Sequence, residues 1–329
     1  MYYCKIIFKY NEMKKLFALF LVATALSCGS EDQENQNVAQ SAVSSESVLD
    51  GKMLSFKDEE SFVKEYSDLA ILSKDQLQKW ISDKKVTALL NTSNDSVVMQ
   101  EDIISKSRLI YSDALKSILN AESKVKIGNK MLWLNERSFY LLSENEVNKT
   151  PEELFSLKDK LEVYGQLLGM ADSAGKRTGR GIMPNENLVK TFVSEEVNVN
   201  GTRHRNVVEI FNETIYFSGT NSVQTSKMYL RTTMQYRSCS TWRCSWKENM
   251  YPRTLTTVGF HCSVCDIGHS FWSNRLSLPA ATVSGSQMYL LAEWRFIAPV
   301  ANPHINYAIS GTFICTVVGH AMPVNVSWY

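Results

Sequence analysis

In the first half of the chain, apolar residues recur three and four positions apart, which predicts amphipathic helices. Two expected helices begin at capping-box spacings, in which side chains bond the free backbone N–H groups of the first turn: Ser55 with Asp58, and Ser73 with Gln76. A third helix is expected over residues 101–121. The apolar face of each helix is expected to be core rather than a ligand site.

Two dipeptides predict tight hairpin turns, because each combines residues that tolerate positive φ. Gly128-Asn129 follows an extended run that contains Val125, and a second extended run follows it. Asn200-Gly201 comes after an alternating stretch further along the chain. A β-hairpin is therefore expected at each of these two places.

A further helix is expected to begin at Thr150, which can cap it together with Glu153, and to run to about Leu168. Pro151 suits the first helical position. From residue 188 onward apolar and polar residues alternate, which predicts strands. The expected strands cover residues 207–217, 226–237, 255–262, 288–298, 307–318 and 324–329.

These patterns predict an α+β fold, with a helical N-terminal region that contains a hairpin, followed by an antiparallel β-sandwich. The expected divisions are a signal peptide over 1–28, a disordered tether over 29–50, a helical α+β domain over 51–170, a linker over 171–186 and a β-sandwich domain over 187–329.

Residues 13–28 read MKKLFALFLVATALSC, with two lysines, an apolar run too short to span a bilayer, and then a cysteine. This resembles a bacterial lipoprotein signal, which implies that Cys28 is acylated and becomes the new N-terminus. Ala25 departs from the usual leucine of that signal. Met13 is the expected start, with Met1 as the alternative. The acidic residues after Cys28 fit either a solvated tether or a surface-export signal.

The chain has 329 residues, is 44% apolar and carries a net charge of +1. The apolar content supports a sizeable core. The balanced charge provides no basic surface of the kind that binds nucleic acid, so no nucleic-acid partner is expected. No motif for a cofactor is present, and none is expected.

Four cysteines in the last third of the chain are disulfide candidates, because an exported protein meets an oxidising environment. They are Cys239, Cys244, Cys262 and Cys265. Local pairs and a crossed pairing between the two clusters both remain open. Cys315 is expected to be a small buried apolar residue.

A weaker alternative is a zinc site, since two thiolates and two imidazoles would satisfy tetrahedral coordination. Its ligands would be His261, Cys262, Cys265 and His269. The alternative function that follows is an envelope hydrolase or a metal-binding protein that uses this region.

Trp242 and Trp246 flank Cys244 among polar residues, and we expect them to be exposed and to bind a ligand. Ser96 and Ser173 match a short O-glycosylation pattern. Neither a nucleophile elbow nor a His-Glu-x-x-His motif is present, so no catalytic residue is assigned.

The segments GKMLSFKDEESF from Gly51 and SILNAESKVKIGNKMLWL from Ser117 are similar to the N-terminal region of uncharacterised Bacteroidetes lipoproteins. The resemblance covers about residues 28–142 and implies surface or periplasmic residence without known catalysis. We therefore expect an outer-membrane lipoprotein, held to the membrane by its lipid anchor, with cell-surface exposure and a periplasmic position both open. It would act as a binding or adhesion module for a glycan or a protein.

Overall fold

The computed structural model describes residues 45–92, 110–168, 189–217, 223–241, 243–264, 270–296 and 307–328. Contacts between residues separate Met1–Ala42 from Val43–Tyr329, and every described residue belongs to the second unit. The described helices are α2 (Glu59–Leu69), α3 (Lys74–Lys84), α4 (Leu89–Thr92), α5 (Asp113–Ile118) and α6 (Pro151–Leu157), with a 3-10 turn at Lys158–Lys160.

The capping boxes at Ser73 and Thr150 are both present and begin α3 and α6, as predicted. The predicted cap at Ser55 is wrong, since Ser55 lies in a strand and the N-cap of α2 is Asp58. The Asp58 carboxylate accepts a hydrogen bond from the backbone N–H of Ser61 at 2.8 Å. The acid therefore caps the helix by itself, three residues later than expected.

Two helix predictions are too long. The helix from Thr150 ends at Leu157, and residues 163–168 form a strand that pairs with strands on both sides. The helix predicted over 101–121 is α5, which begins only at Asp113 and ends at Ile118 within the described part. Its predicted start at residue 101 lies outside the described residues.

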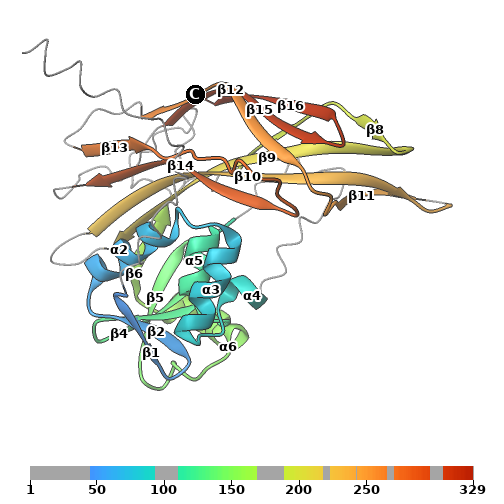
Figure 1. Ribbon diagram of the computed structural model, residues 1–329. Helices are drawn as coiled ribbons and strands as arrows, with labels where there is room; N and C mark the ends of the chain where they lie inside the picture. Colours follow the sequence, from blue (N-terminus) through green and yellow to red (C-terminus); the bar gives the residue numbers. More distant parts are fainter. Residues whose placement is uncertain are drawn as a thin grey trace, which may run out of the picture. The chain divides into compact units, whose positions relative to one another are not determined.

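Sixteen strands form two sheets within the described residues (Figure 1). The 13-stranded sheet contains β1 (Ser47–Asp50), β2 (Met53–Phe56), β3 (Lys124–Ile127), β4 (Lys130–Asn135), β5 (Ser138–Leu142), β6 (Val163–Leu168), β7 (Lys190–Val193), β8 (Val197–Val199), β9 (Thr202–Phe217), β10 (Val223–Cys239), β11 (Cys244–Glu248), β13 (Ser270–Asn274) and β14 (Gln287–Phe296). The three-stranded sheet contains β12 (Thr254–Val264), β15 (Tyr307–Val317) and β16 (His320–Trp328).

The large sheet is mixed, because β2 and β3 pair in parallel and its other pairs are antiparallel within the described residues. The fold is therefore α+β, as predicted at that level. The two predicted hairpins are confirmed as β3–β4 and β8–β9. Asn200 and Gly201 both adopt positive φ, at 50° and 81°, as a tight two-residue turn requires.

Order begins earlier than predicted, because β1 lies within the expected tether of residues 29–50. A turn at Gly51 (φ 61°) brings β1 back against β2, and Ser47 pairs with Phe56. The backbone pairing with β2 fixes residues whose side chains are mostly exposed, so composition alone did not reveal the strand.

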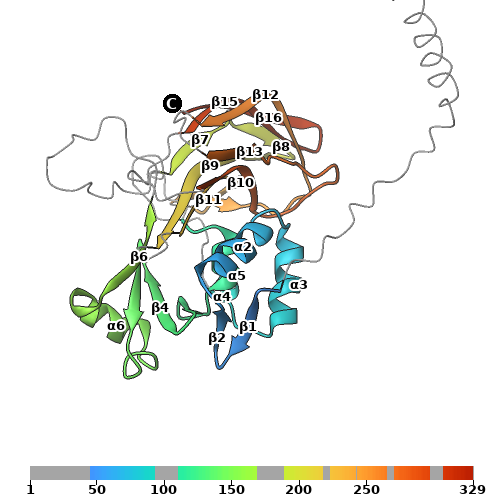
Figure 2. The ribbon, with the colours of Figure 1, turned by 90° about the vertical axis from the view of Figure 1, so that its left-hand side faces the viewer.

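The long strands β9 and β10 carry packed elements on both faces (Figures 1 and 2). Phe211 and Tyr229 point toward α2, α3 and α5 and join one apolar cluster. Ile210 and Leu230, one residue away, join a second cluster with β12, β15 and β16. Alternate side chains of a strand point to opposite faces, so two cores share these strands.

The predicted linker over 171–186 lies outside the described residues. The strands on either side of it belong to one sheet, since β6 pairs with β9 over Gly165–Leu168. The predicted division into a helical domain and a β domain stays a prediction.

Candidate functional site

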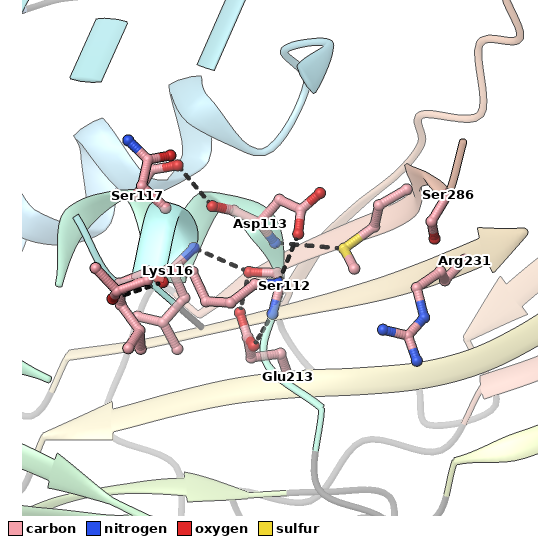
Figure 3. A network of polar contacts seen from close by, with 12 residues as sticks. Ser112, Asp113, Lys116, Ser117, Glu213, Arg231 and Ser286 are labelled. Atoms are coloured by element: carbon pink, nitrogen blue, oxygen red, sulfur yellow. Dashed lines mark hydrogen bonds and ion pairs between the residues drawn. The ribbon is translucent and has the colours of Figure 1, made fainter. Parts of the chain in front are cut away.

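Glu213 on β9 is the centre of a buried network of polar side chains (Figure 3). Its carboxylate accepts hydrogen bonds from the backbone N–H of Ser112 at 2.8 Å and from the Ser112 hydroxyl at 2.6 Å. The Tyr66 hydroxyl also donates to this carboxylate, and it accepts from the hydroxyl of Tyr229 at 3.0 Å. The network therefore joins helices α2 and α5 to strands β9 and β10.

Burial dominates the titration of this network. It raises the pKa of the Glu213 carboxyl above its usual value, although the hydrogen bonds from Ser112 and Tyr66 act in the opposite direction. Burial also raises the pKa of the Tyr66 and Tyr229 hydroxyls well above their usual range. The two phenols are therefore donors throughout the physiological pH range.

Lys227 on β10 forms a second buried group beside the first. Its ammonium lies 3.0 Å from a carboxylate oxygen of Glu293, donates to Ser67 at 2.9 Å and lies 4.5 Å from the ring centre of Tyr66. A buried charge is tolerated only when it is paired and hydrogen-bonded. These contacts satisfy Lys227, and they fix α2 against the sheet.

The positions of these side chains define their role. Glu213 and Lys227 are fully buried, so a solute has no path to them in the described structure. Their geometry holds the helices on the sheet rather than presenting a general acid or a nucleophile to a substrate. An open cleft lies next to them.

An open cleft of about 860 Å³ lies beside this network. Its walls come from the α2–α3 connection, the segment that leads from β13 to β14, and the first residues of β14; the lining residues are 70–76, Glu248, Met250, Arg275, 277–279, 282–285 and 287–290. The volume is within the range of small-molecule and cofactor sites. The network borders the cleft through Met288, whose sulfur accepts the Asp113 backbone N–H at 3.4 Å.

The cleft combines apolar walls with charges of both signs. Ile71 and Met250, which are 57% and 63% exposed, contribute apolar surface to the cleft. The charged lining residues are Lys74, Asp75, Glu248 and Arg275. Glu248 is partly engaged, because its carboxylate accepts the backbone N–H of Ser286 at 2.6 Å. The cleft is formally neutral, so it has no strong preference for an anion or a cation.

Arg253 fixes the wall that runs between β13 and β14. Its backbone exchanges two hydrogen bonds with Val283, at 2.9 and 2.8 Å, and its guanidinium donates to the carbonyl of Gly285. The side chain is almost completely buried. The segment is therefore held from beneath at two points, which gives the cleft a defined edge.

The sequence patterns did not predict this cleft. The only signal was weak: residues 275–286, which contain Ser, Pro and Gly, connect two strands over a length at which loops without secondary structure begin to be uncommon. The residues on the opposite wall, 70–76, indicate in the sequence only the start of a helix.

The expected exposure of Trp246 is wrong, since its side chain is only 7% exposed. It lies on β11, and the Arg205 guanidinium carbon is 4.1 Å from the centre of its indole ring. The cation covers one aromatic face and removes it from solvent. Trp242 lies outside the described residues.

The structure places the described disulfide candidates differently. Cys239 and Cys244 form a disulfide across the β10–β11 hairpin, which is the local one of the alternative pairings. Cys262 is buried on β12 and is not part of that bridge. Cys315 is buried as predicted, and burial raises the pKa of its thiol to about 11.

Only two of the four proposed zinc ligands lie in the described residues. His261 is exposed and Cys262 is buried, so these neighbours on β12 point to opposite faces of the strand. Cys265 and His269 lie outside the described residues. Within the described part of the chain, no group of three or more His, Cys, Asp or Glu side chains is placed to hold a metal ion.

Three further predicted sites lie outside the described residues: the acylated Cys28 and the O-glycosylation candidates Ser96 and Ser173. Among the described helices, none has both the length and the apolar character needed to cross a membrane.

No protein-family model and no curated protein matches this chain. Among solved structures, the chain has a weak similarity to the crystal structure of a DUF4848 family protein from Bacteroides thetaiotaomicron. The two sequences are 12% identical, the TM-score is 0.20, and the similarity covers 85% of this chain and 98% of the other.

Proposed function

We propose that this protein is an exported, lipid-anchored binding protein that takes its ligand in the cleft between the α2–α3 connection and the start of β14. The observation that carries the proposal is the cleft itself, with its volume of about 860 Å³ and its exposed Ile71 and Met250. Large aliphatic side chains that face an open cleft are typical of a site that a ligand covers.

The proposal includes three expectations from the sequence. The protein is anchored through Cys28 in the outer membrane, facing the cell surface or the periplasm, it belongs with the uncharacterised Bacteroidetes lipoproteins, and its C-terminal strands form a β-sandwich domain. Support for the last is the apolar cluster that β9, β10 and β14 share with β12, β15 and β16. Support for the anchor is the signal over residues 13–28.

Binding without catalysis is favoured by the positions of the acidic and basic side chains. Tyr66 and Tyr229, whose hydroxyl pKa values burial raises well above the usual range, are buried behind the cleft together with Glu213 and hold the fold together. The cleft itself is lined by apolar residues, by Ser, Thr and Gln side chains and by four charged residues. It is therefore suited to hold a ligand by contact area.

The anchor is tested by metabolic labelling with palmitate. The full chain should incorporate the label and fractionate with the outer membrane, and Cys28→Ala should lose both properties. A Cys28→Ala protein that stays membrane-bound would contradict the anchor and leave the cleft unaffected.

The cleft is tested by ligand capture on a glycan array and with a library of displayed random peptides. Ile71→Asp should abolish capture, because it places a charge in the cleft wall. Phe155→Asp is the matched control, since Phe155 on α6 has the same 57% exposure and lies outside the cleft. Equal capture by both variants would show that the ligand binds elsewhere, and no capture from either library would contradict a binding function for this cleft.

A further inference from the structure

The first half of β14 has an open edge. β10 pairs with β14 along one side, from Gln287 to Arg295. On the other side, β13 pairs only with residues from Ala292 to Phe296, and the last backbone contact there is the Arg275 N–H to the Leu291 carbonyl at 2.9 Å. No described strand therefore pairs with Gln287–Leu290 on the side away from β10.

This open edge faces the cleft. All four residues from Gln287 to Leu290 line the cleft. Met288 and Leu290 pack with the apolar cluster of the helices, whereas Tyr289 packs with the cluster of the three-stranded sheet. Successive side chains of a strand point to opposite faces, so a cleft lined by all of them must extend around the strand's edge.

We infer that the cleft binds an extended segment of a partner polypeptide, which adds to the edge of β14 as a new strand in line with β13. This inference rests on the proposed function, and it names the class of ligand. A strand edge presents N–H donors and C=O acceptors at the spacing of a second peptide chain, and strand addition is an established mode of peptide recognition.

The lining of the cleft specifies the character of this segment. Its side chains on one face would contact Ile71 and Met288, and those on the other face would contact Val283 and Tyr289, so apolar residues are preferred at successive positions. Tyr289 is the one aromatic side chain among the described residues that line the cleft. A sugar would therefore find little aromatic surface for stacking, which favours a peptide over a glycan.

The open edge also sets the length of the segment. Four residues of β14 are available, and an extended chain rises about 3.3 Å per residue, so the paired part of the segment is short. The four charged lining residues cancel formally. The partner segment is therefore expected to be neutral or to carry charges only at its ends.

The test uses the purified full chain in detergent and a displayed library of random seven-residue peptides. Selected peptides are synthesised with a single N-methyl group placed at each amide in turn. Added strands use every second N–H to pair with the edge, so N-methylation should weaken binding at alternate amides only. The expected loss at those amides is about tenfold or more, because each removes a hydrogen bond and adds a steric block.

The controls separate this inference from the proposed function. Binding that is lost in Ile71→Asp but insensitive to N-methylation at every position would overturn strand addition and leave the cleft as a ligand site. Selection of no peptide, with capture on the glycan array, would overturn the peptide and retain the cleft. Self-association that Ile71→Asp abolishes would show that a second copy occupies the edge, and would overturn the inference as well.

Discussion

Ser112 offers the most direct test of how the helices are held on the sheet. Its hydroxyl donates to the Glu213 carboxylate at 2.6 Å and accepts the backbone N–H of Leu115 at 3.1 Å as the N-cap of α5. Ser112→Ala removes both contacts at once. The cap contributes about 1 kcal/mol, and a hydrogen bond to a buried charged group contributes about 1.5–3 kcal/mol. The expected loss in the free energy of unfolding is therefore about 2.5–4 kcal/mol.

The measurement is urea unfolding of the full chain at neutral pH, followed by far-UV circular dichroism. Ser73→Ala is the matched control, because Ser73 caps α3 in the same way but is exposed and contacts no carboxylate. This control should lose only about 1 kcal/mol. If the two variants were equally stable, the hydrogen bond between Ser112 and Glu213 would contribute nothing, and a stabilising role for the buried network would be refuted.

Three more expectations follow from burial and backbone geometry. Burial raises the pKa of Glu213 above 4.5, so the folded state binds its proton more tightly than the unfolded chain does. Stability should therefore fall as the pH rises from 4.5 toward the folded pKa. Glu213→Gln should remove this pH dependence from the urea midpoint of unfolding. Gly311→Ala should lower the free energy of unfolding by at least about 2 kcal/mol, because the new Cβ would lie 2.4 Å from a backbone carbon and φ is 130°. Gly319→Ala, with open space around it, should lower it by about 1 kcal/mol, and thermal unfolding measures both. Cys315, with its pKa raised to about 11, should resist iodoacetamide in the native protein and react after unfolding, as mass spectrometry would show; rapid native alkylation would contradict its burial.

Local signals in the sequence predicted local structure well. Ser73 and Thr150 each bond the backbone three residues ahead, and Asn200-Gly201 turns through two positive φ angles. These features depend on neighbouring residues, so a pattern of four residues contains them. The wrong predictions concern segments whose secondary structure depends on pairing with residues far away in the sequence. Tyr164 has helical spacing from the preceding leucines, but pairing with β5 and β9 makes its segment a strand.

The buried network and the cleft could not be predicted from local patterns in the sequence. Glu213 alternates with Phe211 and Ile215 along β9, so it is a charged residue on an otherwise apolar strand face, and no local pattern shows which groups would satisfy it. The helices cover that face, so Glu213 is buried among hydrogen-bond donors, and Lys227 on the neighbouring strand is buried in an ion pair. The cleft depends in the same way on segments about 200 residues apart in the sequence, which no local pattern relates.

The backbone pairing of β6 with β9 determines what happens when the chain is cleaved between these two strands. A single cut between Leu168 and Lys190 would leave fragments that remain joined through four residue pairs of one sheet and through a shared core. The nicked protein should elute as one species and separate only in denaturant. Each fragment expressed alone would present an unpaired strand edge, so the two halves should aggregate separately and recover solubility when produced together.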